Sequence, residues 1–342
     1  MSRQARARQL TTVLLVLLPL CLLAALALGS VSLGLNESLQ AISQLGQQPE
    51  NRSAIIVNQI RLPRALLAGL VGALLGISGA AMQGIFRNPL ADPSLIGVTA
   101  GASLGASLVI AVIGSGISGL TGLTLISVGA FAGGMLAVVL VYRLASSESG
   151  TSVATMLLAG IAITALAGAM SNVLELFSSN EVLRRISLWR MGGLDGADYS
   201  RVAVAAGIGM VVIAVLPRYA TALNAFLLGE SEARYLGIDV ERTKTGIVLM
   251  VAIAVGTSVA LAGTIAFVGL VVPHIIRLLI GPDHRYLLPA SAIAGALLLI
   301  SADIIARTVI APTELPVGIV TACVGVPFFV SLLHRRREFG MQ

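Results

Sequence analysis

Charged side chains are scarce in this chain, and long apolar runs take their place. Only 11% of its 342 residues are charged, while 56% are hydrophobic and the mean hydropathy is +0.95. A water-soluble domain has no room to bury so large a share of apolar residues. The composition therefore excludes a soluble protein and indicates one that is integral to a membrane.

Lysine and histidine are especially rare. Lys244 is the only lysine, and it follows Thr243. A phosphate-binding P-loop requires a lysine directly after a glycine, so this chain cannot be a P-loop ATPase, and any ATP-driven work must use a separate ATPase subunit. His274, His284 and His334 are scattered without metal-ligand spacing, so no metal site is predicted.

Cysteine and aromatic residues are few as well. The two cysteines, Cys21 and Cys323, lie in apolar runs, which favours inert packing over a redox or metal role. Aromatic residues make up 4% of the chain, and no basic stripe carries interleaved aromatic side chains. No nucleic-acid partner is therefore expected.

Ten apolar segments are long enough, or nearly so, to cross a lipid bilayer, which takes about 20 residues per helix. They are too long and too uniformly apolar for barrel strands. We therefore expect an all-α integral membrane fold, with residues 1–342 forming a single transmembrane domain. The segments are 11–33, 61–84, 94–114, 120–142, 153–177, 201–217, 245–265, 267–280, 287–306 and 316–333.

Basic residues predict the orientation, because cytoplasmic loops of membrane proteins carry more lysine and arginine than external loops. Placing the N-terminus inside puts most of the 22 basic residues in inside segments, so both termini are expected in the cytoplasm. The first segment also contains Ala25-Leu26-Ala27, which resembles a signal-peptide cleavage site. Because the apolar run is long enough to span, we favour a retained first helix embedded in lipid.

Small residues recur at every fourth position in three of the predicted helices. Such ridges let membrane helices approach closely where hydrophobicity cannot drive association. The pattern therefore predicts tight packing rather than ligand contact. The ridges comprise Gly72, Gly76, Ala80 and Gly84, then Gly97, Gly101 and Gly105, and then Gly129 and Gly133.

Ionisable residues within membrane helices are costly and indicate function or pairing. Asp303 and Arg307 are spaced i,i+4 and can pair on one helix face. Glu175 lies late in the fifth segment, where it can face water in a pore or cap the edge of the bundle. A proton-coupled secondary transporter using Glu175 and Asp303 is therefore one alternative function.

Six ordered motifs together resemble the permease subunit of bacterial ABC importers for iron-siderophores, heme and cobalamin. The resemblance implies ten helices per subunit and a homodimer around a central pore. It also implies two cytoplasmic ATPase subunits that bind ATP-Mg, a periplasmic substrate-binding protein and a location in the inner membrane. The motifs are RLPR at 61–64, MQGIFRNPLADPSLIG at 82–97, GESEARYLGI at 229–238, FVGLVVPHIIR at 267–277, DHRYLLP at 283–289, and ADIIARTVIAPTELPVGIVTACVGVPFF at 302–329.

The resemblance implies docking residues at the periplasmic face. In the family, arginines of the RLPR and ADIIAR segments receive acidic residues of the binding protein, which here are Arg61, Arg64 and Arg307. Exposed guanidinium groups suit this role because they bind carboxylates in a bidentate manner and steer encounter. Arg307 then has two roles open to it, docking or pairing with Asp303.

The charged inside segment at about 218–244 resembles the family's ATPase contact. Glu230, Glu232 and Ala233 begin a predicted short helix, and Gly237 ends it, as glycine does at helix C-termini. The resemblance implies that these four residues couple the permease to its ATPase, with a solvated connector as the alternative.

The NPL turn between the second and third segments resembles the family's cytoplasmic gate. That resemblance points to Asn88 and Leu90, and Pro89 and Pro93 fix a sharp turn that prevents the helix from continuing. The second gate element falls near 149–152, where the match is poor.

The substrate is the least determined part of this interpretation. SLWRMGGLDG at 187–196 looks most like the heme branch, and Arg184, Arg185 and Arg190 near the outer mouth suit the propionates of heme. They equally suit an anionic ferric siderophore, with cobalamin as a third alternative. Heme or a related iron chelate is thus the expected cargo, and the chain itself is expected to hold no cofactor and to be no enzyme.

Overall fold

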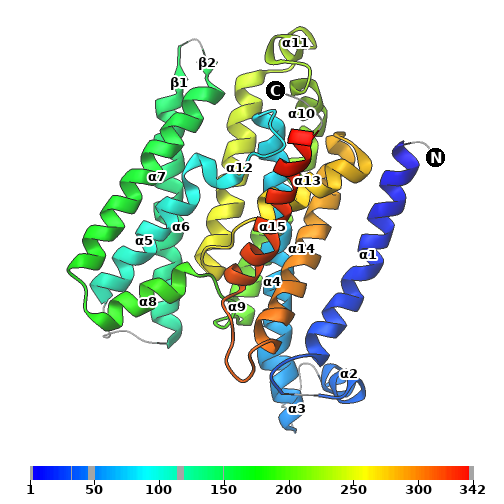
Figure 1. Cartoon of the computed structure of the whole chain (residues 1–342), viewed down its shortest axis with the longest axis vertical. Helices are drawn as coiled ribbons and strands as arrows, with labels where there is room; N and C mark the ends of the chain where they lie inside the picture. Colours follow the sequence, from blue (N-terminus) through cyan, green and yellow to red (C-terminus); the bar gives the residue numbers. More distant parts are fainter. Residues whose placement is uncertain (1–2, 32, 45–50, 114–118, 149, 339–342) are drawn as a thin grey trace.

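The computed structural model describes residues 3–31, 33–44, 51–113, 119–148 and 150–338, and it is mainly helical (Figure 1). The first half comprises α1 (Arg3–Ala27), α2 (Leu35–Ser43), α3 (Arg52–Ile55), the π-helical η1 (Ile56–Arg61), α4 (Leu62–Ile85), the 3-10 helix η2 (Pro93–Ile96), α5 (Val98–Ile113), α6 (Gly119–Ala145) and the antiparallel strands β1 (Ser146–Ser147) and β2 (Gly150–Thr151). The second half comprises α7 (Val153–Leu176), α8 (Asn180–Arg190), α9 (Tyr199–Val215), the 3-10 helix η3 (Leu216–Tyr219), α10 (Ala220–Phe226), α11 (Glu230–Tyr235), α12 (Val240–Ala262), α13 (Val268–Ile280), α14 (His284–Thr308) and α15 (Val317–Glu338).

Each of the ten predicted segments coincides with one apolar helix in the described part of the chain. Seven are long enough to cross a membrane, and α5, α13 and the 317–331 part of α15 are shorter. The predicted all-α membrane fold is confirmed. The first helix begins at Arg3 rather than at residue 11, because arginine, glutamine and alanine are good helix formers and extend the helix beyond the apolar run.

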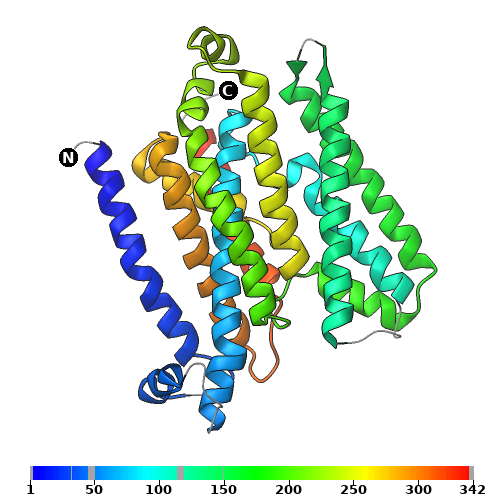
Figure 2. The same ribbon diagram turned by 180° about the vertical axis from the view of Figure 1, so that it is seen from behind.

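Helix α4 forms the centre of the bundle. It packs against α9, α12, α13 and α14, and 20 of its 24 residues are buried. Helix α1 lies at one edge, where it contacts α14, while α5, α6, α7 and α8 form a group at the opposite edge (Figures 1 and 2). The outer faces of α1 and α7 are largely exposed and apolar, as expected for surfaces that meet lipid or another membrane subunit.

The bundle has two distinct ends. Both chain termini lie toward the end that also carries α10, α11 and the β1–β2 hairpin, which we call the α11 end (Figure 1). The opposite end, the α2 end, carries α2 and α3 (Figures 1 and 2). The start of α1 and the end of α15 thus lie toward one end of the bundle (Figure 1), while the cytoplasmic placement of both termini stays a prediction.

Glycines of the predicted ridges lie at close helix contacts. A side-chain carbon added to Gly72 would collide with the carbonyl oxygen of Gly295, and one at Gly105 with that of Gly129. The first pair brings α4 against α14, and the second brings α5 against α6. Glycine is thus required at these points because no other residue leaves room for the facing backbone.

Candidate functional site

A half-open cavity of about 660 Å³ lies beside α7 and is the candidate substrate site. Its walls come from η2, α5, α7, α8 and the loop after α12. Six hydroxyl side chains and one guanidinium make the wall partly polar within an otherwise apolar bundle, and no described lining residue is a histidine. These polar side chains belong to Ser94, Thr99, Ser103, Thr164, Ser171, Thr264 and Arg190.

The wall formed by η2 depends on an interruption of helical structure between α4 and α5. Asp92 caps η2 by accepting a hydrogen bond from the Ser94 amide at 2.8 Å, and Gly97 ends it in the left-handed conformation with φ of 79°. Burial raises the pKa of the Asp92 carboxyl, and the hydrogen bond from Ser94 opposes that rise. Gly160 of α7 lies against the Leu95 carbonyl, so α7 approaches η2 closely.

The three predicted mouth arginines do not gather at one site. Arg190 lines the 660 Å³ cavity and donates to Glu175 at 2.8 Å. Arg185 instead lines a separate cavity of about 330 Å³, and Arg184 is exposed. Successive residues of a helix are about 100° apart, so Arg184, Arg185 and Arg190 leave α8 in different directions. Their role at the substrate mouth stays a prediction.

The predicted gate turn is a well-ordered loop at the end of α4. The Asn88 side chain accepts a hydrogen bond from the Leu90 amide at 3.0 Å, and the Ala91 amide donates to the Asn88 carbonyl at 3.0 Å. His274 of α13 lies 3.2 Å from the Pro89 carbonyl. Asn88 is exposed and Leu90 partly so. The role of Asn88 and Leu90 as a gate stays a prediction.

The predicted second gate element at 149–152 overlaps the β1–β2 hairpin: Gly150 and Thr151 form β2, Ser152 precedes α7, and Ser149 lies outside the described residues. The hairpin joins α6 to α7, and Ser147 pairs with Gly150. Ser152 then caps α7 by accepting from the Thr155 amide. The hairpin therefore sets where α7 begins.

The predicted docking arginines are buried, which contradicts the expectation that they are exposed. Arg64 donates to Asp303 at 2.8 Å and to Glu314 at 2.7 Å, and Arg307 lies 3.3 Å from the second oxygen of Asp303. The side chains of Arg64, Arg307 and Asp303 are 7%, 5% and 1% exposed. The burial has a physical reason: a carboxylate inside a membrane bundle needs charged partners, and two arginines supply them.

Arg61 is buried by a different set of partners. Its guanidinium donates to the carbonyls of Leu26 and Ala27 at 2.6 and 2.8 Å and also to the carbonyl of Val31. These oxygens lie at and after the C-terminus of α1, where helix carbonyls lack partners. Arg61 therefore holds the end of α1 against the start of α4. The docking role of all three arginines stays a prediction that their burial does not favour.

Helix α11 has the predicted form, since it runs from Glu230 to Tyr235 and Gly237 follows in the left-handed conformation with φ of 81°. Ala233 is fully buried, while Glu232 is exposed. A short helix with one buried small residue and an exposed acidic face can be contacted by another protein. Its role in coupling, including those of Glu230 and Gly237, stays a prediction.

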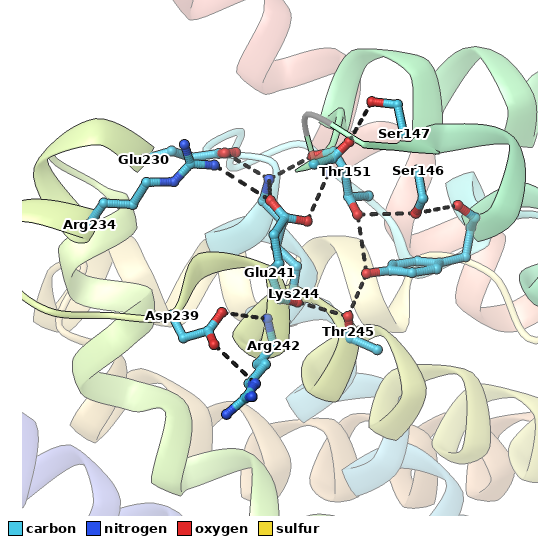
Figure 3. Close-up of polar contacts among 12 residues, drawn as sticks. Ser146, Ser147, Thr151, Glu230, Arg234, Asp239, Glu241, Arg242, Lys244 and Thr245 are labelled. Carbon is cyan, nitrogen blue, oxygen red and sulfur yellow. Dashed lines mark hydrogen bonds and ion pairs between the residues drawn. The ribbon is translucent and has the colours of Figure 1, made fainter.

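Lys244 is a functional candidate that sequence reasoning missed. Its side chain is 1% exposed at the first turns of α12, and Nζ lies 2.7 Å from Glu230 and 2.7 Å from the Thr151 carbonyl (Figure 3). Its rarity in the sequence could have revealed it, because it is the only lysine of an apolar protein. It also lies at the start of a membrane helix, next to the segment predicted to contact an ATPase.

Comparison with known proteins decides the family. The model of the FecCD transport family matches residues 15–335, which is nearly the whole chain. The chain belongs to the FecCD transport family. This membership, together with the apolar helices, makes the chain a multi-pass membrane transport protein. The resemblance inferred from the motifs is confirmed.

Relatives within this family differ in their cargo. The hemin transport system permease protein HmuU of Yersinia pestis is 44% identical over 319 residues, covering 93% of this chain and 95% of the relative. The cobalamin import system permease protein BtuC of Halobacterium salinarum is also 44% identical, over 282 residues that cover 82% and 74% of the two chains. The structure described as an inward-facing conformation of a putative metal-chelate type ABC transporter superposes with a TM-score of 0.84 at 29% identity, covering 96% and 99% of the two chains.

Proposed function

We propose that two copies of this FecCD-family chain form the pore of an ATP-driven importer in the bacterial inner membrane, and that the pore carries heme into the cytoplasm. The observation that carries the proposal is the half-open cavity beside α7. Its volume of about 660 Å³ falls within the range of small-molecule sites, roughly 300–1,000 Å³. A cavity open on the outer face of one protomer would expose a polar solute to lipid unless a second protomer covered it.

The two ends of the bundle fit this assignment. The α11 end carries both chain termini and the short helix α11 (Figure 1), so it is the side on which the positive-inside rule puts the cytoplasm. Two separate ATPase subunits bind there, because this chain has no P-loop lysine. The binding protein delivers its cargo at the α2 end.

Heme is favoured over the other cargoes by the cavity wall and by similarity to a hemin permease. Two copies of the chain supply two Arg190 side chains, one for each propionate of heme. The hydroxyl groups of the wall contact a cargo without coordinating its iron, and a site without strong coordination can release what it carries. A ferric siderophore and cobalamin are the alternative cargoes within the same mechanism.

A proton-coupled secondary transporter is less compatible with the observed contacts. Glu175 is paired with Arg190, and Asp303 with both Arg64 and Arg307. Both carboxylates are therefore occupied by arginine guanidinium groups instead of facing an open path for protons.

The cargo is tested by uptake into proteoliposomes that hold the permease, its ATPase and its binding protein. Heme, a ferric hydroxamate siderophore and cobalamin are offered in turn, with and without ATP. The proposal predicts ATP-dependent accumulation of heme at a higher rate than either alternative. Accumulation of cobalamin or the siderophore with no uptake of heme would refute the assignment of heme while leaving the importer intact.

A further inference from the structure

Lys244 is a buried cation in a chain with almost no lysine. Its side chain is 1% exposed, and it lies one turn into α12. Removing an ammonium group from water costs several kcal/mol unless charged and hydrogen-bonding partners replace the water. The protein therefore has to surround this amine with oxygen atoms.

Three oxygen partners come from three different segments. Nζ lies 2.7 Å from Glu230 Oε2 of α11, 2.7 Å from the Thr151 carbonyl of β2, and 3.6 Å from Glu241 Oε1 of its own helix. Figure 3 shows Glu230 and Thr151 approaching the amine from opposite sides, one from α11 and the other from the hairpin. One side chain thus joins the short helix to the hairpin.

Glu241 reinforces this junction. It accepts a hydrogen bond from the Thr151 amide at 2.8 Å and lies 3.6 Å from Arg234 of α11 (Figure 3). Within the described residues, both ion pairs that leave α11 therefore end on Lys244 or Glu241, and both of these side chains also hold the backbone of Thr151. Both side chains bond backbone atoms of Thr151, the amide and the carbonyl. The geometry of these contacts therefore does not depend on a flexible side chain of the hairpin.

The β1–β2 hairpin connects Lys244 and Glu241 to α7. Thr151 Oγ1 donates to the Tyr142 hydroxyl at 3.2 Å and lies 3.1 Å from the Ser146 hydroxyl, so the hairpin is held against the end of α6. Ser152, the next residue, is the N-cap of α7. Farther along, α7 supplies Thr164 and Ser171 to the cavity wall. The path from α11 to the cavity is therefore continuous in the chain and in space.

We propose that Lys244 is the positioning residue that carries displacement of α11 to the β1–β2 hairpin and hence to α7. The proposal rests on the proposed function, in which an ATPase moves α11. Short hydrogen bonds to fixed oxygens resist both stretching and sliding, whereas an apolar contact of similar area permits α11 to slip over the hairpin. The ion pair between Lys244 and Glu230 is the part of the path that joins the two moving segments.

The test uses the full complex in proteoliposomes and measures two rates, ATP hydrolysis and substrate import. The variants are Lys244→Met, which keeps an unbranched side chain one atom shorter and without the charge, and Glu230→Gln, which is nearly isosteric at a partly exposed position. Both are expected to assemble with the ATPase and to hydrolyse ATP, while import per ATP falls about tenfold, as loss of a charge-assisted hydrogen bond implies. Lys244→Arg, which keeps the charge and the donors, is expected to restore much of that ratio.

Arg242→Gln is the matched control, because it removes one positive charge two residues away. Arg242 is 91% exposed, and its ion pair among the described residues is a local one with Asp239. An unchanged import-to-ATP ratio in Lys244→Met and Glu230→Gln would overturn the proposal, and so would an equal loss of import and ATPase activity or failure of the complex to assemble. If the wild-type complex itself imports nothing with ATP, the proposed function fails, and that result is distinct from a failure of the proposed role of Lys244.

Discussion

The carboxylate of Asp303 lies 2.8 Å from Nε of Arg64, and this buried ion pair joins α14 to α4. Arg307, one turn farther along α14, lies 3.3 Å from the other oxygen of the same carboxylate. The cluster thus places Asp303 between two arginines at the α2 end of the central helix pair, and Glu314 is a second acidic partner of Arg64 at 2.7 Å. Its first consequence is for stability.

Asp303→Asn is expected to destabilise the protein, because it removes the counter-charge of buried Arg307 and leaves buried Arg64 with Glu314 as its acidic partner. Breaking a buried pair costs roughly 3–5 kcal/mol, and thermal unfolding of the purified permease in detergent measures the loss. Asp239→Asn is the control, since its pair with exposed Arg242 contributes about 0–1 kcal/mol and asparagine still caps α12. Equal melting temperatures for the two variants would contradict a structural role of the cluster.

Arg61→Lys separates a structural role of Arg61 from a docking role. Lysine keeps the charge, but its single amine cannot reproduce the fork that binds the carbonyls of Leu26, Ala27 and Val31. We expect a lower melting temperature and an unchanged salt dependence of the affinity for the binding protein. A stable Arg61→Lys variant, together with a charge-reversed variant whose affinity loses its dependence on salt, would instead support docking.

Gly72→Ala is expected to force α4 and α14 apart, because the added methyl group collides with the Gly295 carbonyl. Overpacking of this kind costs about 1–3 kcal/mol. Gly207 of α9 is the control, since a side chain there meets nothing within 4 Å and alanine favours the helix. Thermal unfolding should rank Gly207→Ala at or above wild type and Gly72→Ala below it; the reverse order would exclude close packing as the reason for the ridge.

Gly168→Leu tests whether the cavity beside α7 is the path of the substrate. Gly168 lines the cavity, and a side chain there enters open space. The bulky residue is expected to lower import severalfold while ATP hydrolysis continues, because the obstruction is in the pore and not at the ATPase. Gly207→Leu, which lies outside the cavity wall, serves as the comparison. Normal import through Gly168→Leu would place the path elsewhere.

Much of the fold could be predicted because membrane helices follow from composition alone. The ten apolar runs and the four-residue spacing of glycines are local signals, and the structure places Gly72 and Gly105 where the spacing predicted close contact. Helix α1 begins at Arg3 and not at the predicted residue 11, because a helix can extend beyond the apolar run.

The site was harder to predict because burial of a charge depends on partners far away in sequence. Arg64 and Asp303 are 239 residues apart, and Lys244 and Thr151 are 93 apart. From the sequence, the RLPR motif has the pattern of a charged flank of a helix. In the folded chain, Arg61 instead binds carbonyl groups at the end of α1. Only the assembled bundle reveals which arginines are buried.

The central claim is that this chain is a passive conduit driven by a separate ATPase. The most direct measurement compares heme accumulation in liposomes that contain the permease alone under an imposed proton gradient with accumulation in liposomes that contain the complete complex and ATP. The account predicts accumulation against a gradient only in the second case. Accumulation by the permease alone, with no ATPase present, would contradict it.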